Sequence, residues 1–265
     1  MRARKAVSRA PVLLAVPAAL GLALLLIPLL GLLVRAPWRS LPDLLTDDTV
    51  GQALSLSLRA AGSATLISLV LGVPLAWALA RLELPGRRLL RALVTLPLVL
   101  PPVVGGLALL LVFGRHGLLG PALDRAFGVS LPFTTAAVVL AETFVAMPFL
   151  VVTVEGALAA GDLRLEEAAA SLGARPWTTF WRVTLPQVGP SVAAGAALCF
   201  ARALGEFGAT ITFAGSFPGT TQTMPLAVYL ALERDPDAAI ALALVLLGLS
   251  VMVLVLLRER WLRPA

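Results

Sequence analysis

Six long apolar runs divide the chain, and short polar or charged segments separate them. The runs continue for about 20 residues or more, the length that an α-helix needs to cross the hydrocarbon core of a membrane. Their apolar residues are continuous and do not alternate with polar ones, which favours helices over the strands of a membrane barrel. The pattern therefore predicts an all-α integral membrane protein with six transmembrane helices. The runs cover residues 11–34, 53–80, 89–113, 134–154, 187–213 and 238–257.

The first run follows a basic segment, residues 1–10, that resembles the start of a signal peptide. The run is longer than the roughly 7–15 apolar residues of a cleaved signal, so we expect it to stay as the first transmembrane helix. The expected organisation is one six-helix domain at 11–257, with cytoplasmic tails at 1–10 and 258–265.

The distribution of basic residues predicts the orientation in the membrane. If the N-terminus is cytoplasmic, fourteen of the 21 Lys and Arg residues fall in cytoplasmic segments and five on the outer side. Arg59 and Arg202 lie within the runs. This excess places both termini in the cytoplasm under the positive-inside rule. The net charge of +6 then reflects orientation, and we expect no nucleic-acid partner.

Composition excludes several kinds of site. Charged residues make up 14% of the chain, against about 25% in soluble domains. Cys199, His116 and Lys5 are single examples of their residue types. One cysteine cannot form an internal disulfide, and one histidine cannot build a multi-histidine metal site. No P-loop motif surrounds Lys5, so this chain is not expected to bind ATP through one.

Proline and glycine interrupt the third run, in the segment TLPLVLPPVVGG at residues 95–106. Such residues free backbone groups that must be satisfied inside the protein or by water. Two interpretations stay open. The distorted helix lines a transport pathway around Pro101 and Pro102, or it is a packing kink of the kind that membrane helices tolerate.

Four ionisable residues fall within the runs, and such residues are costly at membrane depth. Arg59 lies early in its run and is expected to reach the outer interface. Arg202 and Glu206 are four residues apart on one helix, so their side chains can meet. Either these charges pair structurally, with Glu142 completing a network, or Arg202 helps an anion across while Glu206 holds or gates it.

The longest segment between runs predicts a helical hairpin at about 162–186 on the cytoplasmic side. Asp162 suits a helix N-cap, and Gly173 suits the left-handed position that ends a helix. Pro176 suits the first position of a second helix, which is expected to end at Leu185-Pro186. Aromatic residues at helical spacing share one face of it: Trp177, Phe180 and Trp181. The alternative is a loop that lies on the membrane with its tryptophans at the interface.

The hairpin resembles the EAA loop of ABC importer permeases. The segment Glu167-Ala168-Ala169 is followed at the family's spacing by Gly173 and by Val183-x-Leu185-Pro186, with Val in place of the usual Ile. The resemblance implies that the hairpin docks onto a separate ATPase subunit. The residues expected to carry this coupling are Glu166, Glu167, Ala168, Ala169, Gly173, Ala174, Leu185 and Pro186.

Four further segments resemble the molybdate-type oxyanion permeases. They are residues 95–106, 113–120, 201–215 and 218–229. The resemblance implies a MetI-like fold in a bacterial plasma membrane and ATP-driven import of molybdate by alternating access. Its expected partners are an ATPase dimer, which carries ATP and magnesium, an extracytoplasmic oxyanion-binding protein and a second copy of this chain. No catalytic residue, metal or cofactor is expected on the chain itself. Candidate pathway residues are Pro101, Pro102, Glu142, Arg202 and Glu206.

Other functions stay open at this point. Within the family, the substrate could be sulfate, thiosulfate or tungstate. An intramembrane enzyme would need a catalytic set at membrane depth, and the sequence has no G-x-S-G or G-x-G-D motif. A passive channel or a secondary transporter would need no ATPase and gives no reason for the hairpin.

Overall fold

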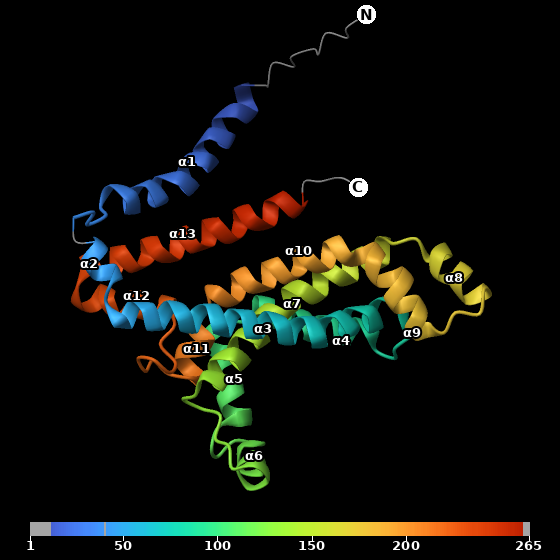
Figure 1. Cartoon of the computed structure of the whole chain (residues 1–265). Helices are drawn as coiled ribbons and strands as arrows, with labels where there is room; N and C mark the ends of the chain where they lie inside the picture. Colours follow the sequence, from blue (N-terminus) through green and yellow to red (C-terminus); the bar gives the residue numbers. More distant parts are fainter. Residues whose placement is uncertain (1–11, 40, 262–265) are drawn as a thin grey trace, which may run out of the picture.

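The computed structural model describes residues 12–39 and 41–261, and throughout this part the regular structure is helical (Figure 1). The expected tail 1–10 and residues 262–265 lie outside the described residues. Residues 258–261, expected in the second tail, continue the last helix. The elements are α1 (Val12–Val34), α2 (Leu41–Leu45), α3 (Asp48–Arg81), α4 (Arg87–Val99), α5 (Pro102–Phe113), α6 (Gly120–Phe127), α7 (Thr135–Ala160), α8 (Leu163–Ser171), α9 (Pro176–Thr179), the π-helical turn Phe180–Thr184, α10 (Leu185–Leu204), α11 (Gly208–Phe213), α12 (Met224–Arg234) and α13 (Pro236–Trp261).

Three helices, α3, α7 and α10, form the centre of the molecule. The largest buried cluster joins small residues of α3, such as Ala61 and Ala76, to Leu150 and Val154 of α7 and Cys199 of α10. Alanine and glycine let helix backbones approach closely, which is how membrane helices gain packing contacts without a hydrophobic driving force. Helix α7 is the most deeply buried of the candidate spans.

Among the residues that the structure describes, five helices are long and apolar enough to cross a membrane, and a sixth counts if the bent pair α4–α5 is one span. The predicted run 89–113 is therefore not one straight helix, in agreement with the distortion that its prolines and glycines predict. It bends by 115° between Val99 and Pro102. The physical reason is the Pro101-Pro102 pair. A residue before proline is pushed out of the helical region, and Leu100 and Pro101 both adopt extended conformations, with ψ of 134° and 131°.

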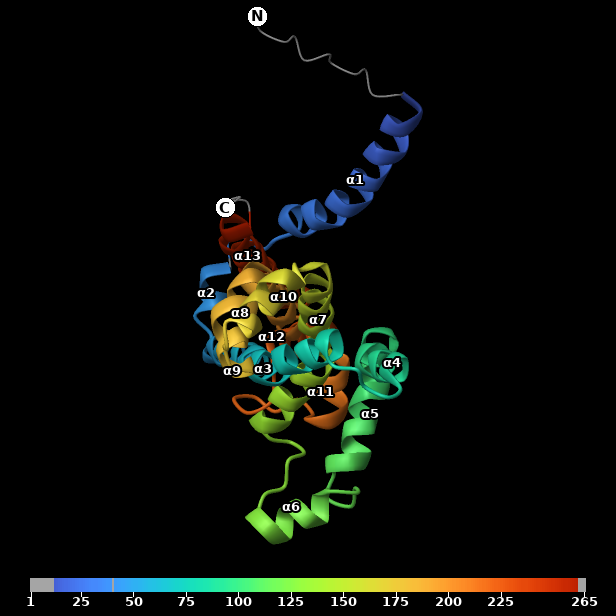
Figure 2. The same cartoon turned by 90° about the vertical axis from the view of Figure 1, so that its right-hand side faces the viewer.

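The run 187–213 is also not one helix. Helix α10 ends at Leu204, and the short helix α11 begins at Gly208. The bend in α4–α5 aims α5 and α6 sideways out of the bundle, as Figures 1 and 2 both show. Both interruptions lie where α5 and α11 pack together.

Helix α1 lies apart from the central bundle (Figures 1 and 2). The exposed side chains along it include Leu24, which is 74% exposed, and Leu25 and Ile27. Its N-terminal position and length agree with the predicted first span. The hairpin around α8 and α9 lies at the opposite end of the molecule from α2 and α12 (Figure 1). This separation agrees with the predicted cytoplasmic and outer ends.

Candidate functional site

The hairpin predicted for the cytoplasmic side forms where the local signals place it. The side chain of Asp162 accepts a hydrogen bond from the Arg164 backbone N–H at 3.0 Å and so caps α8. Gly173 has a φ of +81°, the left-handed conformation that glycine adopts without steric cost. The next residue, Ala174, donates from its N–H to the Ala169 carbonyl at 3.0 Å. These hydrogen bonds turn the chain between α8 and α9, so the predicted helix–glycine–helix hairpin is confirmed.

The first turns of α8 place two neighbouring glutamates in different surroundings. Glu167 and Ala168 are exposed, whereas Glu166 is half-buried and faces the body of the protein. Ala169 and Ala174 are half-buried, and no residue of α8 is fully buried. Helix α8 therefore offers a largely free surface, as the predicted docking element requires.

The aromatic flank packs back against the bundle. The Phe180 ring lies edge-on to Trp77 of α3, with centroids 6.2 Å apart. Trp177 and Trp181 complete the cluster around Phe180. A groove of about 680 Å³ runs beside these rings, lined by apolar residues of α3 and α10. The cluster fixes the hairpin's second arm to α3.

The second arm meets the fifth span at the predicted Leu185-Pro186, but the backbone stays helical across this junction. The helix continues from Pro176 to Leu204 without a break, through the π-helical turn Phe180–Thr184. Leu185 donates its N–H to the Phe180 carbonyl, five residues back. The ring of a proline clashes with the carbonyl four residues before it, and the wider turn gives Pro186 the room it needs. Leu185 packs against the central core, and Pro186 is exposed.

A second candidate site lies at the break between α10 and α11. One oxygen of Glu206 accepts a hydrogen bond from the Ala209 N–H at 2.8 Å and satisfies the first turn of α11. The other lies 2.6 Å from Arg202 Nη2, on the last turn of α10. A cation suits that position because the carbonyl end of a helix carries partial negative charge. The predicted pairing of Arg202 with Glu206 is confirmed.

The two carboxylates of this site are both buried, whereas the cation is not. Glu206 and Glu142 are each 1% exposed, and the Arg202 side chain is 27% exposed. Glu142 lies on α7 close enough to Glu206 for their charges to interact, yet its Oε2 has no hydrogen-bond partner in the described part of the chain. The predicted network is therefore a pair, with Glu142 beside it as a second acid.

The proline pair of the third run lies next to this site. A Cβ on Gly208 would come within 2.8 Å of the Pro102 side chain, and a Cβ on Gly106 within 2.7 Å of the Ala209 carbonyl. Helices α5 and α11 therefore approach through two glycines. Pro101 and Pro102 are exposed at the bend. The structure brings Pro102, Glu206 and their neighbours together from two interrupted runs.

Arg59 does not belong to this site. It is exposed on α3, and its guanidinium donates to the carbonyl and hydroxyl of Ser55, one turn closer to the outer end. This direction agrees with the predicted reach toward the outer interface.

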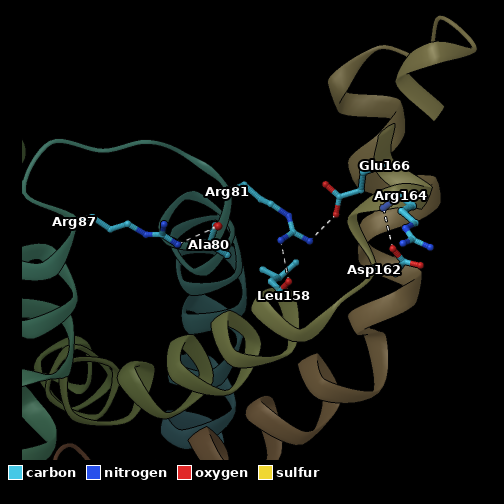
Figure 3. A network of polar contacts seen from close by, with 7 residues as sticks. All are labelled: Ala80, Arg81, Arg87, Leu158, Asp162, Arg164 and Glu166. Carbon is cyan, nitrogen blue, oxygen red and sulfur yellow. Dashed lines mark hydrogen bonds and ion pairs between the residues drawn. The ribbon is translucent and has the colours of Figure 1, made fainter. Parts of the chain in front are cut away.

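A polar network that no pattern in the sequence predicted lies at the hairpin end of the bundle (Figure 3). Arg81, the last residue of α3, donates to the Leu158 carbonyl at 2.9 Å and pairs with Glu166 at 2.9 Å. Arg87 donates to the Ala80 carbonyl at 3.1 Å, and on α4 Arg91 pairs with Glu155 of α7. In the sequence these arginines served only to predict the orientation in the membrane. Their contacts could not be predicted, because the partners lie up to 85 residues away.

Comparisons with known proteins agree with this arrangement. The family described as "Binding-protein-dependent transport system inner membrane component" matches residues 68–264. The molybdenum transport system permease protein of Mycobacterium tuberculosis is 51% identical over 84% of each chain. The corresponding protein of Escherichia coli is 43% identical over 72% of this chain and 83% of its own. A probable sulfate transport system permease of Chlorokybus atmophyticus is 38% identical, over 80% of this chain and 74% of its own.

Solved structures show the same fold at low sequence identity. A bacterial ABC transporter that imports alginate matches with a TM-score of 0.71 and 17% identity, over 93% of this chain and 94% of its own. The methionine ABC transporter MetNI matches with a TM-score of 0.61 and 18% identity, over 80% and 95%. The expected MetI-like, all-α fold is thus confirmed. On its family match and its relatives, the chain belongs to the inner membrane components of binding-protein-dependent transport systems, and it is a transport permease subunit, not an enzyme.

Proposed function

We propose that this chain is the permease subunit of an ATP-driven importer of molybdate. The observation that carries the substrate is the 51% identity to a molybdenum permease over 84% of both chains, against 38% to a sulfate permease. Sulfate, thiosulfate and tungstate remain the alternatives, since all are tetrahedral dianions of related chemistry.

The exposed surface of α8 supports a separate ATPase as the energy source. Glu167 and Ala168 stand free on it, and the only lysine of the chain lacks a P-loop around it. In this proposal an ATPase dimer binds ATP and magnesium and engages the hairpin of residues 162–186. This chain needs no cofactor of its own. An extracytoplasmic binding protein delivers the anion at the opposite end.

We place the pathway at the break between α10 and α11, within a single domain at 11–257. Arg202 supplies a positive charge that offsets the desolvation of a dianion. Glu206 neutralises part of that charge at 2.6 Å, which suits brief contact because tight binding would stop transport. Glu142 adds a second acid close to Glu206. Pro101 and Pro102 hold the neighbouring bend open.

A second copy of this chain completes the pathway in this proposal. Pro101, Pro102 and Gly205 are exposed around the break. Helix α1, whose exposed side chains include Leu24 and Leu25, and the side arm α5–α6 extend from the bundle (Figure 2). Exposed apolar surface of this extent is typical of an interaction face or of contact with lipid. Two copies facing each other across Gly205 would enclose Arg202 between them.

Uptake of labelled molybdate tests the substrate. The chain is expressed with its ATPase and binding protein in cells that lack their own molybdate permease, with excess sulfate or tungstate as competitors. We expect uptake that tungstate blocks and sulfate does not. Block by sulfate would move the protein to the sulfate branch. An assembled complex without uptake would contradict molybdate as the substrate, but not the assignment to the permease family.

A further inference from the structure

The cytoplasmic end of the bundle holds one arginine that touches three helices at once. Arg81 ends α3, its Nη1 donates to the Leu158 carbonyl near the end of α7, and its Nη2 pairs with Glu166 in the first turn of α8 (Figure 3). Both side chains are largely shielded from water, at 13% and 18% exposure. Shielded, charged hydrogen bonds are stronger than those at an open surface.

The contact with Leu158 has its own physical reason. The last four carbonyls of a helix have no partner within it, and Leu158 lies in the last turn of α7. Its carbonyl otherwise accepts only a 3.3 Å hydrogen bond from Gly161, which adjoins the turn into α8. A guanidinium at this position satisfies the carbonyl and complements the helix dipole. Arg81 therefore stabilises the turn between α7 and α8 as well as the Glu166 side chain.

The two glutamates of α8 then differ in direction. Glu167 is exposed, while Glu166 is half-buried and pairs with Arg81. A force applied to α8 reaches α7 through the backbone at Gly161. It also reaches α3 directly through the ion pair of Arg81 with Glu166, in addition to the packing of α7 against α3. The aromatic contact of Trp77 with Phe180 joins α3 to the other arm.

We propose that Arg81 is a positioning residue that couples movement of α8 to α3 and α7 through Glu166. The inference rests on the proposed function, because it concerns how an ATPase bound at the hairpin drives the spans. Glu166 takes no direct part in holding the ATPase. Its role is to keep α8 fixed to the ends of two central helices, so that the hairpin does not move alone.

The test uses the full complex of this chain with its ATPase and binding protein in proteoliposomes. Three quantities are measured: co-purification of the ATPase, ATP hydrolysis and labelled molybdate taken up per ATP hydrolysed. We expect Arg81→Glu and Glu166→Arg each to lower uptake per ATP by about fivefold or more, the usual range of a coupling between two sites. ATPase binding should stay within twofold of the unmodified complex.

The double variant Arg81→Glu with Glu166→Arg restores an ion pair of reversed sign, and we expect it to recover at least half of the lost coupling. Arg88→Glu is the matched control. Arg88 is exposed on the same end of the molecule, and the same charge change there should leave uptake per ATP unchanged. A purely structural role would lower the amount of assembled complex and leave its uptake per ATP intact.

A second pair of variants covers the case in which charge reversal prevents assembly. Glu166→Gln should assemble and lose coupling, whereas Glu167→Gln should weaken ATPase binding. Normal uptake per ATP in Glu166→Gln, or no recovery in an assembled double variant, would overturn the proposal. Absence of ATP-driven molybdate uptake in the unmodified complex would instead overturn the proposed function. The two failures are therefore distinguishable.

Discussion

At the residue scale, the carboxylate of Glu206 has two roles, one in the structure of α11 and one in the charge of Arg202. Glu206 closes the first turn of α11 through the Ala209 N–H and also neutralises Arg202. Glu206 is buried and Arg202 is partly exposed, so the cation is the member that a passing anion can reach. Structural and transport roles can be separated only by changing both residues.

Arg202→Gln should lower stability and uptake together, because it leaves a buried carboxylate unpaired, at a cost of roughly 1–3 kcal/mol or more. The double variant Arg202→Gln with Glu206→Gln removes both charges and should restore assembly, measured by the yield of purified complex. We expect it to stay deficient in molybdate uptake. Full uptake in the double variant would assign the pair a structural role alone.

Residue types alone pointed to Glu142, Arg202 and Glu206, since charges at membrane depth are rare. Spacing predicted that Arg202 meets Glu206, one helical turn away. It did not predict that Glu142 stays outside this ion pair, because Glu142 lies on another helix. Arg81 and Glu166 are 85 residues apart, and a single sequence carries no signal that joins them.

At the scale of elements, the hairpin was the most predictable part of the molecule. Its capping aspartate, its glycine in the left-handed conformation and its proline at the start of α9 are local signals that act within a few residues. The prolines and glycines of the third run predicted a distortion but not its size, and the interruption of the fifth run was not predicted. Hydropathy registers apolar length, not direction, so it does not distinguish a straight helix from one bent by 115°.

Gly173→Pro tests the turn of the hairpin. Proline fixes φ near −65° and has no N–H, whereas Gly173 has a φ of +81° and donates to the Ala170 carbonyl at 2.9 Å. We expect ATPase co-purification to fall at least tenfold, about 1.4 kcal/mol in binding, with normal membrane insertion. Gly189→Ala is the control, since a Cβ there meets no neighbouring atom within 4 Å. Normal ATPase binding in Gly173→Pro would contradict the docking role.

Gly106→Ala tests the close approach of α5 to α11. Its added Cβ would lie 2.7 Å from the Ala209 carbonyl oxygen, and overpacking of this kind costs about 1–3 kcal/mol. We expect a lower thermal midpoint of the purified chain and reduced uptake. Gly51→Ala, where a Cβ meets nothing within 4 Å, should leave both unchanged. An unaltered midpoint in Gly106→Ala would mean that the two helices separate easily.

At the scale of the whole molecule, the described helices divide into a packed centre and two extensions. The central helices α3, α7 and α10 bury one another, while α1 and the arm α5–α6 extend away (Figure 1). Sequence composition predicted a membrane protein and six spans, but not which spans lie at the centre. That order depends on how small residues of separate helices match, which periodicity does not encode.

Gly205→Cys tests the proposed face between copies. In a Cys199→Ser background the new thiol is the only one, and Gly205 is exposed at the break. We expect mild oxidation in membranes to yield a disulfide-linked dimer on a gel. Gly248→Cys, on the exposed side of α13, should give little disulfide-linked dimer. No dimer from a Gly205→Cys thiol that still reacts with a maleimide would place the partner elsewhere.

The backbone stays helical from Pro176 to Leu204, but α9 and α10 run in different directions (Figure 1). The π-helical turn Phe180–Thr184 and the prolines Pro186 and Pro190 lie between the aromatic arm and the rest of α10, and features of both kinds commonly bend helices. At its other end α10 is separated from α11 by the interruption at residues 205–207. Helix α10 therefore has a bend at one end and a break at the other, so it can change its tilt without carrying α11 along as a rigid extension.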